Sequence, residues 1–103
     1  MDTILEIRKH PFRHCLEVRS FSEAVKNRIH IYDPEAKVIL FGSRARGDAE
    51  PDSDWDLLVL TKRTDTEFLM GILLKDLLYQ VEMPNDWIIS LLVRNEAEWN
   101  DGY

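Results

Sequence analysis

The middle of the chain, residues 37–60, reads KVILFGSRARGDAEPDSDWDLLVL and contains two apolar runs separated by a polar stretch. The first run, residues 37–41, is rich in strand formers and bounded by turn residues, which predicts a buried strand. The second run, residues 55–60, ends in four consecutive apolar residues, which predict a central strand covered on both faces. Residues 42–53 contain glycine and proline and predict a loop with room for one helical turn.

Helical patterns flank these strands. Phe21, Val25 and Ile29 recur at the spacing of one helix face, and residues 20–23 have the spacing of a capping box, although the helix could begin near Phe12. A turn is predicted at Asp33-Pro34-Glu35.

A second helix is predicted over residues 65 to about 82, ended by the stretch Met83-Pro84-Asn85-Asp86. Gly71 inside it costs about 1 kcal/mol relative to alanine, which predicts a close packing contact there. Its apolar stripe comprises Met70, Leu73, Leu74, Leu77 and Val81.

The remaining segments complete an α/β (α+β) order of helices packed against a small mixed sheet. Residues 1–9 predict a short helix, residues 87–93 a third strand, and residues 95–99 a final helical turn.

Length and composition limit the classes of function. With 103 residues the chain is expected to form one domain over residues 1–103. A formal net charge of −6 argues against bulk nucleic-acid binding, which needs a basic face. No apolar run approaches the roughly 20 residues of a membrane span. The single cysteine, Cys15, cannot form an internal disulfide, and the first ten residues carry Asp2 and Glu6 and no long apolar core, unlike a signal peptide, so we expect a cytoplasmic protein.

Two acids at the start of the second strand are candidate metal ligands. Asp54 and Asp56 are two residues apart, so both carboxylates point to one face while Trp55 points to the other. Like charges at that distance repel unless a cation or proton donors compensate them. Mg²⁺ (or Mn²⁺) is suited to this, because it takes one or two carboxylates and fills its other positions with water and phosphate oxygens. The alternative is that these acids are ordinary turn and cap residues.

The loop after the first strand has the composition of a phosphate-binding turn. Gly42 permits close approach of the backbone to a ligand, and Ser43 adds a hydroxyl and an N–H group. Arg44 and Arg46 can neutralise triphosphate charge. The Gly-x4-Gly spacing of Gly42 to Gly47 is not a P-loop, because an acid, Asp48, stands where that motif requires lysine. The alternative is a strand-ending turn with solvated arginines.

Residues 41–48, FGSRARGD, together with residues 51–57, PDSDWDL, resemble the signature of the polymerase-β-like nucleotidyltransferase superfamily, and in particular its minimal nucleotidyltransferases. That resemblance implies that Gly42 and Ser43 hold the phosphates of a nucleoside triphosphate, and that Asp54 and Asp56 bind Mg²⁺ and are the catalytic acids. Such proteins transfer a nucleoside monophosphate to a hydroxyl and release pyrophosphate.

One position departs from the family pattern. The superfamily usually places a third carboxylate on the next core strand, and Ser90 stands there in this chain, with Asp86 as the nearest acid before it. Two functions are therefore expected from the resemblance. One is a Mg²⁺-dependent nucleotidyltransferase that uses ATP, or another triphosphate, and modifies a partner protein. The other is a catalytically weak, antitoxin-like or regulatory nucleotide-binding subunit that pairs with a helical protein of the HEPN class.

Overall fold

A computed structural model describes residues 12–102, so the helix predicted over residues 1–9 lies outside the described part of the chain. The predicted order of elements is confirmed, with a short helix inside the central loop. The elements are α1 (Phe12–Tyr32), β1 (Lys37–Phe41), α2 (Gly42–Arg46), β2 (Trp55–Thr61), α3 (Thr66–Leu77), the π-helix η1 (Leu78–Glu82), α4 (Met83–Asn85), β3 (Ile89–Asn95) and α5 (Glu96–Gly102).

The three strands form one mixed sheet in the order β1-β2-β3. β1 pairs with β2 antiparallel, whereas β2 pairs with β3 parallel, so the predicted central position of β2 is confirmed. The register places Asp56 directly between Phe41 on β1 and Ser90 on β3. Partners in register present their side chains to the same face of a sheet, so these three side chains form one row.

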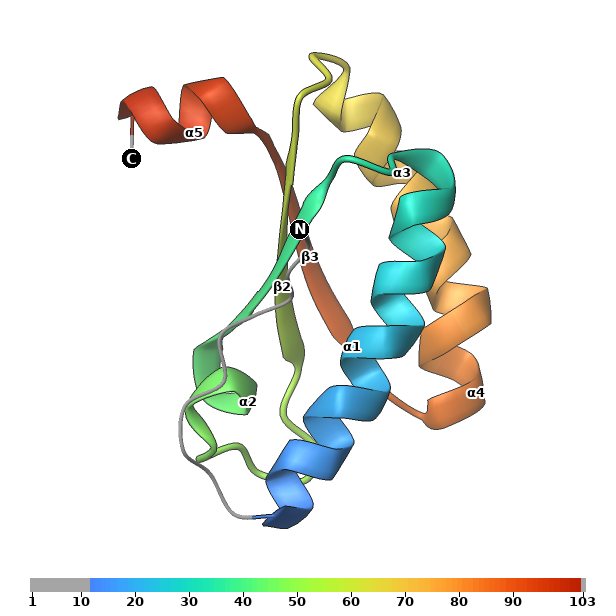
Figure 1. Cartoon of the computed structure of the whole chain (residues 1–103). Coiled ribbons are helices and arrows are strands. Elements are labelled where there is room, and N and C mark those ends of the chain that lie inside the picture. The colour runs from blue at the N-terminus through green and yellow to red at the C-terminus, as the bar shows by residue number, and fades with distance from the viewer. Residues whose placement is uncertain (1–11, 103) are drawn as a thin grey trace.

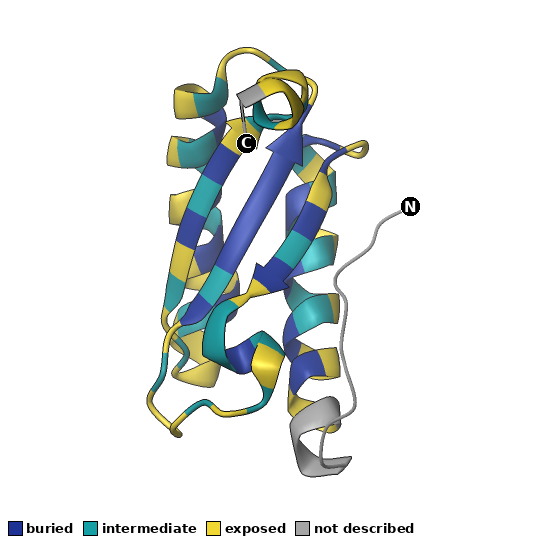
Figure 2. Cartoon of the chain, turned by 90° about the vertical axis from the view of Figure 1, so that its left-hand side faces the viewer, coloured by how far each residue is buried: buried dark blue, intermediate teal, exposed yellow. Residues whose placement is uncertain are grey.

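The long helices cover one face of the sheet. Figure 1 shows α1, α3 and α4 on one side of the strands, with the shorter α2 and α5 toward opposite ends of the other side. Figure 2 looks onto that second face, where buried β2 runs between its two neighbours. The prediction of a buried first strand is only half right, because β1 is an edge strand whose Val38 and Leu40 are buried while Lys37 and Phe41 are exposed.

The first helix is one continuous element, and the capping box predicted at residues 20–23 is wrong. The helix begins at Phe12, eight residues before Ser20, and the chain at Ser20 is helical. Its buried face includes Val18, one turn before Phe21, so the apolar periodicity does not stop at the predicted cap. In the part of the chain that the structure describes, every helix is too short or too polar to cross a membrane.

The second long helix differs from its prediction in three respects. Its buried stripe is Leu69, Leu73, Leu77 and Val81, whereas Leu74 is 44% exposed. Gly71 is exposed, and a Cβ there would have no neighbour within 4 Å, so the predicted packing contact is absent. The helical run also passes Glu82, the predicted last helical residue, and ends at Asn85, inside the stretch 83–86 that was predicted to end it, where Asp86 takes a left-handed conformation (φ 57°).

The third strand begins two residues later than predicted. Trp87 packs against the rings of Phe21 and Trp55, with 5.4 Å between ring centroids in each pair, and stays outside the ladder. The ladder of paired residues starts at Ile89. Directly before it, the Ile88 carbonyl accepts a hydrogen bond from the Trp55 N–H at 2.8 Å. A shift of two residues preserves the alternation of side chains, so Ser90 still faces the row of Asp56.

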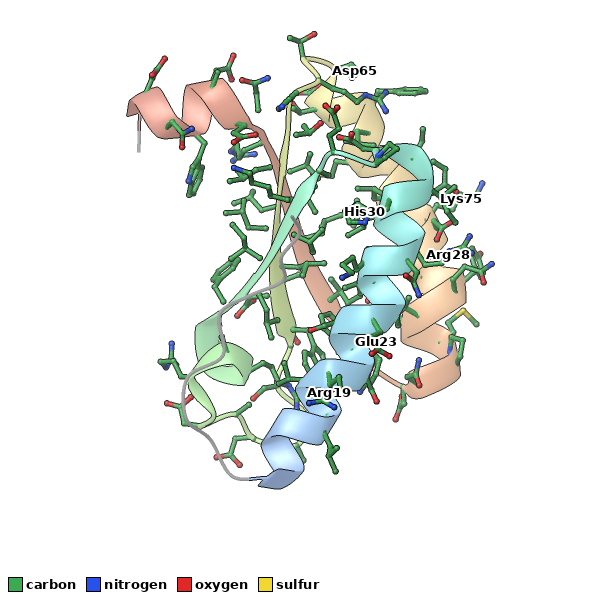
Figure 3. All side chains as sticks on the ribbon, in the orientation of Figure 1. Arg19, Glu23, Arg28, His30, Asp65 and Lys75 are labelled. Carbon is green, nitrogen blue, oxygen red and sulfur yellow. The ribbon has the colours of Figure 1, made fainter. Side chains whose placement is uncertain are left out.

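An ion pair joins the two long helices. Arg28, labelled on α1 in Figure 3, donates from Nε and Nη2 to the two carboxylate oxygens of Asp76 on α3, each at 2.8 Å. The Tyr32 hydroxyl donates a third hydrogen bond to Asp76 Oδ2 at 2.6 Å. These bonds fix the relative position of α1 and α3, the helices that support the sheet from behind.

Candidate functional site

Gly42 and Asp56 meet where β1 ends and β2 begins. Gly42 has a φ of 78°, in the left-handed region that glycine tolerates and other residues rarely adopt. A Cβ built on Gly42 would overlap Oδ2 of Asp56 and would lie 3.1 Å from its Cγ. Glycine is therefore favoured here by its own backbone conformation, and any other residue would also force the Asp56 carboxylate to shift.

Asp54 and Asp56 are held in different ways. Asp56 lies within β2, paired on both sides, and points away from the fully buried Trp55, as the alternation predicts. Asp54 is exposed and precedes the first residue of the strand, so the ladder itself does not fix it. Its position depends on the residues on either side of it.

Trp55 anchors this end of β2 in the hydrophobic core. Its ring is 0% exposed and stacks on Phe21 of α1, with 4.1 Å between centroids and 15° between ring planes. A large aromatic side chain buried between the two acids fixes the register of the strand, because a slip by one residue would bring a carboxylate into the core.

Ser43 and Arg46 lie on α2, and within residues 12–102 their side chains form no hydrogen bond or ion pair with a core residue. Ser43 is half-buried, and its carbonyl accepts the N–H groups of Gly47 and Asp48 at 2.9 and 3.2 Å, which closes the short helix. The side chain of Arg46 is 63% exposed and pairs with exposed Asp48 at 3.3 Å. Exposed ion pairs contribute about 0–1 kcal/mol, so Arg46 can exchange this partner for a ligand at little cost.

Arg44 has partners other than the phosphates that the sequence predicts. It is 5% exposed, its Nη2 donates to the carbonyls of Pro51 (3.1 Å) and Ser53 (3.0 Å), and its Nε donates to Ser53 at 3.3 Å. The guanidinium lies over the Trp55 ring, 4.3 Å from the centroid. Its remaining nitrogen, Nη1, is 3.4 Å from Oε1 of Glu17. The structure thus separates Arg44 from Arg46 and turns it toward the protein interior.

Helical geometry explains this separation. Residues 42–46 form a helix, in which each residue advances by about 100°, so Arg44 and Arg46, two residues apart, point to nearly opposite sides of α2. The inward direction of Arg44 follows from the pattern once the turn is treated as helical. The sequence allows a helical turn here, since Arg44, Ala45 and Arg46 are helix formers and Gly47 is a typical helix-ending residue, but the prediction gave both arginines the same phosphate role without using this periodicity.

The chemistry of the two acids suits a divalent cation. Among residues 12–102, no hydrogen bond or ion pair joins a described side chain to the carboxylate of Asp54 or Asp56. No group of three histidine, cysteine or acidic side chains in the described part of the chain could hold a metal. Mg²⁺ needs no more than one or two protein carboxylates when a triphosphate supplies the other oxygens, so the residues present fit that ion.

Ser90 adjoins Asp56 on the neighbouring strand. The two are partners in register, and Ser90 is exposed. A serine hydroxyl is not ionised at neutral pH and is a weaker Mg²⁺ ligand than a carboxylate. Asp86, the acid considered as a substitute, lies in a left-handed turn (φ 57°) at the end of α4, three residues before β3.

Comparisons with known proteins agree with this geometry. A family model described as the nucleotidyltransferase domain matches residues 18–101. A solved structure of Cid1, described for its RNA terminal uridylyl transferase activity, is similar with a TM-score of 0.55 and 25% sequence identity. The similarity covers 68% of this chain but only 22% of the Cid1 chain. Comparison with curated proteins gave no match. The family match extends over α1 to α5 and includes every residue of the site, and the chain therefore belongs to the nucleotidyltransferase domain family.

Proposed function

We propose that this chain is a Mg²⁺-dependent nucleotidyltransferase of the minimal nucleotidyltransferase group. It would transfer a nucleoside monophosphate from ATP, or another triphosphate, to a hydroxyl on a partner protein. The observation that carries the proposal is the contact between Gly42 and the uncompensated Asp56 carboxylate, which brings the Gly-Ser turn and the Asp-x-Asp strand together. Mn²⁺ would serve in place of Mg²⁺, since both favour oxygen ligands.

Each residue of the site has a role in this proposal. Asp54 and Asp56 hold the metal, and Gly42 and Ser43 contact the phosphates through N–H groups that the first turn of a helix leaves without acceptors. Arg46, exposed on α2 two residues beyond the buried Arg44, neutralises phosphate charge. When bound, the metal would draw phosphate oxygens to the two carboxylates and offset the charge that develops on the departing pyrophosphate.

Ser90 favours a second candidate function. A general base beside the acceptor hydroxyl typically contributes about 10²–10⁴-fold in rate, and the strand neighbour of Asp56 is a serine. The chain would then be a catalytically weak or inactive nucleotide-binding subunit, antitoxin-like or regulatory, that pairs with a HEPN-type helical protein.

Isothermal titration with ATP and Mg²⁺ tests the function that both candidates share. The wild type should bind the pair, and a variant carrying Asp54→Asn and Asp56→Asn should not. A matched control is Asp48→Asn with Asp52→Asn, which also removes two exposed acids from the same loop and should retain binding. Equal affinity in the two double variants would exclude the metal assignment.

Transfer of label separates the two candidates. The protein is incubated with ATP labelled at the α-phosphate, Mg²⁺ and a helical protein of the HEPN class, taken from a neighbouring gene if that gene encodes one. Label appearing in the partner, together with released pyrophosphate, supports the transferase. Binding of ATP and partner without transfer of label supports the regulatory subunit.

A further inference from the structure

We propose that Arg44 is a positioning residue, whose guanidinium ties α2 to the loop before β2 and thereby holds Asp54 beside Asp56. Its importance for metal binding depends on the function proposed above for the two acids. The role differs from the phosphate contact that the sequence predicts, because Arg44 acts through the backbone of the loop and not on the ligand.

Both the nitrogens and the flat face of the Arg44 guanidinium make contacts. One edge of the guanidinium donates to the carbonyls of Pro51 and Ser53, at 3.0 to 3.3 Å, and its flat face lies 4.3 Å from the centroid of the buried Trp55 ring. A planar, rigid fork that is both hydrogen-bonded and stacked fixes the groups around it in direction as well as in distance.

Asp54 lies between two anchored neighbours. On its C-terminal side, the N–H of Trp55 donates to the Ile88 carbonyl at 2.8 Å. On its N-terminal side, the Ser53 carbonyl accepts two hydrogen bonds from Arg44. Removal of Arg44 would leave one anchor only, for a residue that already lies outside the strand.

Other bonds of the loop do not replace this connection. Ser53 bonds with Glu50 in both directions, N–H to carbonyl at 3.0 Å and Oγ from the Glu50 N–H at 2.9 Å, which stabilises the turn but does not attach it to α2. Among described side chains, hydrogen bonds between α2 and residues 51–53 come from Arg44 alone.

The positive charge of Arg44 allows a test in which two explanations of its role predict opposite changes in Mn²⁺ affinity. If Arg44 acted only as a nearby positive charge, Arg44→Met would strengthen the binding of Mn²⁺ alone, because a repulsive charge would be removed. If Arg44 positions Asp54, the same variant should bind Mn²⁺ about 10- to 100-fold more weakly, as when residues that orient metal ligands are replaced. Arg44→Lys keeps the charge but not the fork, and it should also weaken binding.

Electron paramagnetic resonance of Mn²⁺, without nucleotide, measures these affinities. The matched control is Arg28→Met, which removes an arginine from its pair with Asp76, away from the site. It should lower stability yet leave Mn²⁺ affinity unchanged. The proposal would be overturned if both Arg44 variants bound Mn²⁺ as tightly as the wild type. It would also be overturned if Arg28→Met lost as much Mn²⁺ affinity as the Arg44 variants do.

Amide hydrogen exchange gives a readout that needs no metal. The Ser53 N–H should exchange about tenfold faster in Arg44→Met and Arg44→Lys than in the wild type, while amides of α3 keep their rates. Failure of the wild type to bind Mn²⁺ would refute the proposed function, whereas unchanged exchange at Ser53 would refute the positioning role. If Arg44→Met does not fold, the same two measurements on Arg44→Lys decide the question.

Discussion

Gly42 lies against the carboxylate of Asp56 so closely that a methyl group on Gly42 would overlap Oδ2 of that side chain. The two residues are 14 positions apart in the sequence and meet because Phe41, the last residue of β1, pairs in register with Asp56. The antiparallel pairing of β1 with β2 therefore brings the turn and the acid together before any ligand binds.

We expect Gly42→Ala to destabilise the protein. A Cβ in the left-handed region costs about 1–2 kcal/mol from the backbone alone, and overlap with Asp56 adds to this. The free energy of unfolding in urea measures the effect. Binding of Mn²⁺ should weaken at the same time, because the Asp56 carboxylate must move aside.

Gly71→Ala is the matched control for that change. Gly71 lies inside α3 and is exposed, and a Cβ added to it would meet no atom within 4 Å. Alanine in a helix interior is favoured over glycine by about 0.8–1 kcal/mol, so this variant should be more stable than the wild type. A loss of stability in Gly71→Ala, or none in Gly42→Ala, would contradict the distinction between the two glycines.

We expect the variant with Asp54→Asn and Asp56→Asn to retain its fold and lose its response to Mg²⁺. Two carboxylates without partners among residues 12–102 contribute repulsion and no described bond, so their neutralisation should leave stability unchanged or slightly raised. Melting temperature with and without Mg²⁺ and ATP measures the response. A Mg²⁺-dependent rise in this variant equal to that of the wild type would place the metal elsewhere.

The strands were predictable because their signals are local. Apolar runs rich in strand formers mark β1 and β2, and simple alternation places Asp56 opposite Trp55. The resemblance of residues 41–57 to the nucleotidyltransferase signature then predicts the family, which the match over residues 18–101 confirms. The metal and phosphate roles of the individual residues stay predictions.

The failures concern residues whose surroundings come from distant parts of the chain. The local sequence pattern does not distinguish Leu69 from Leu74 as members of the buried stripe of α3. Leu69 is buried because of where the sheet and α1 lie. Arg44 is buried because Trp55, 11 residues later, offers its ring and the loop offers its carbonyls. No pattern within the Gly42 loop encodes either partner.

The pair between the long helices predicts how stability depends on pH. The hydrogen bond from Arg28 lowers the pKa of the Asp76 carboxyl, so its contribution to stability is present above the ordinary value near 4 and is lost as pH falls through the lowered folded value. The bond to Asp76 raises the pKa of the Tyr32 hydroxyl, so that contribution is present below about pH 10 and is lost as pH rises further.

Asp76→Asn should therefore flatten the acid side of the stability profile, and Tyr32→Phe the alkaline side. Each should also lower stability near neutral pH, Asp76→Asn by about 1.5–3 kcal/mol for a hydrogen-bonded charge that is largely buried. Asp65→Asn is the comparison, since the pair of Asp65 with Arg63 is more exposed and should contribute less. Urea unfolding from about pH 2 to pH 11 covers both ordinary pKa values.

Ser90→Asp tests whether the site lacks only a third acid. The substitution places a carboxylate beside Asp56, its partner in register. Together with Asp54, the site would then contain three acids. Without metal, this variant should be less stable than the wild type because of repulsion. Mg²⁺ should restore that stability, since an ion that binds only the folded state stabilises it. Transfer of nucleotide to an added acceptor should become faster, by up to about 10²–10⁴-fold if the new acid takes the proton.

Ser90→Asn, similar in size but uncharged, is the control and should show neither effect. A melting temperature of Ser90→Asp that ignores Mg²⁺ would mean that position 90 does not reach the metal, and Asp86→Asn would then be the variant to examine for a loss of transfer.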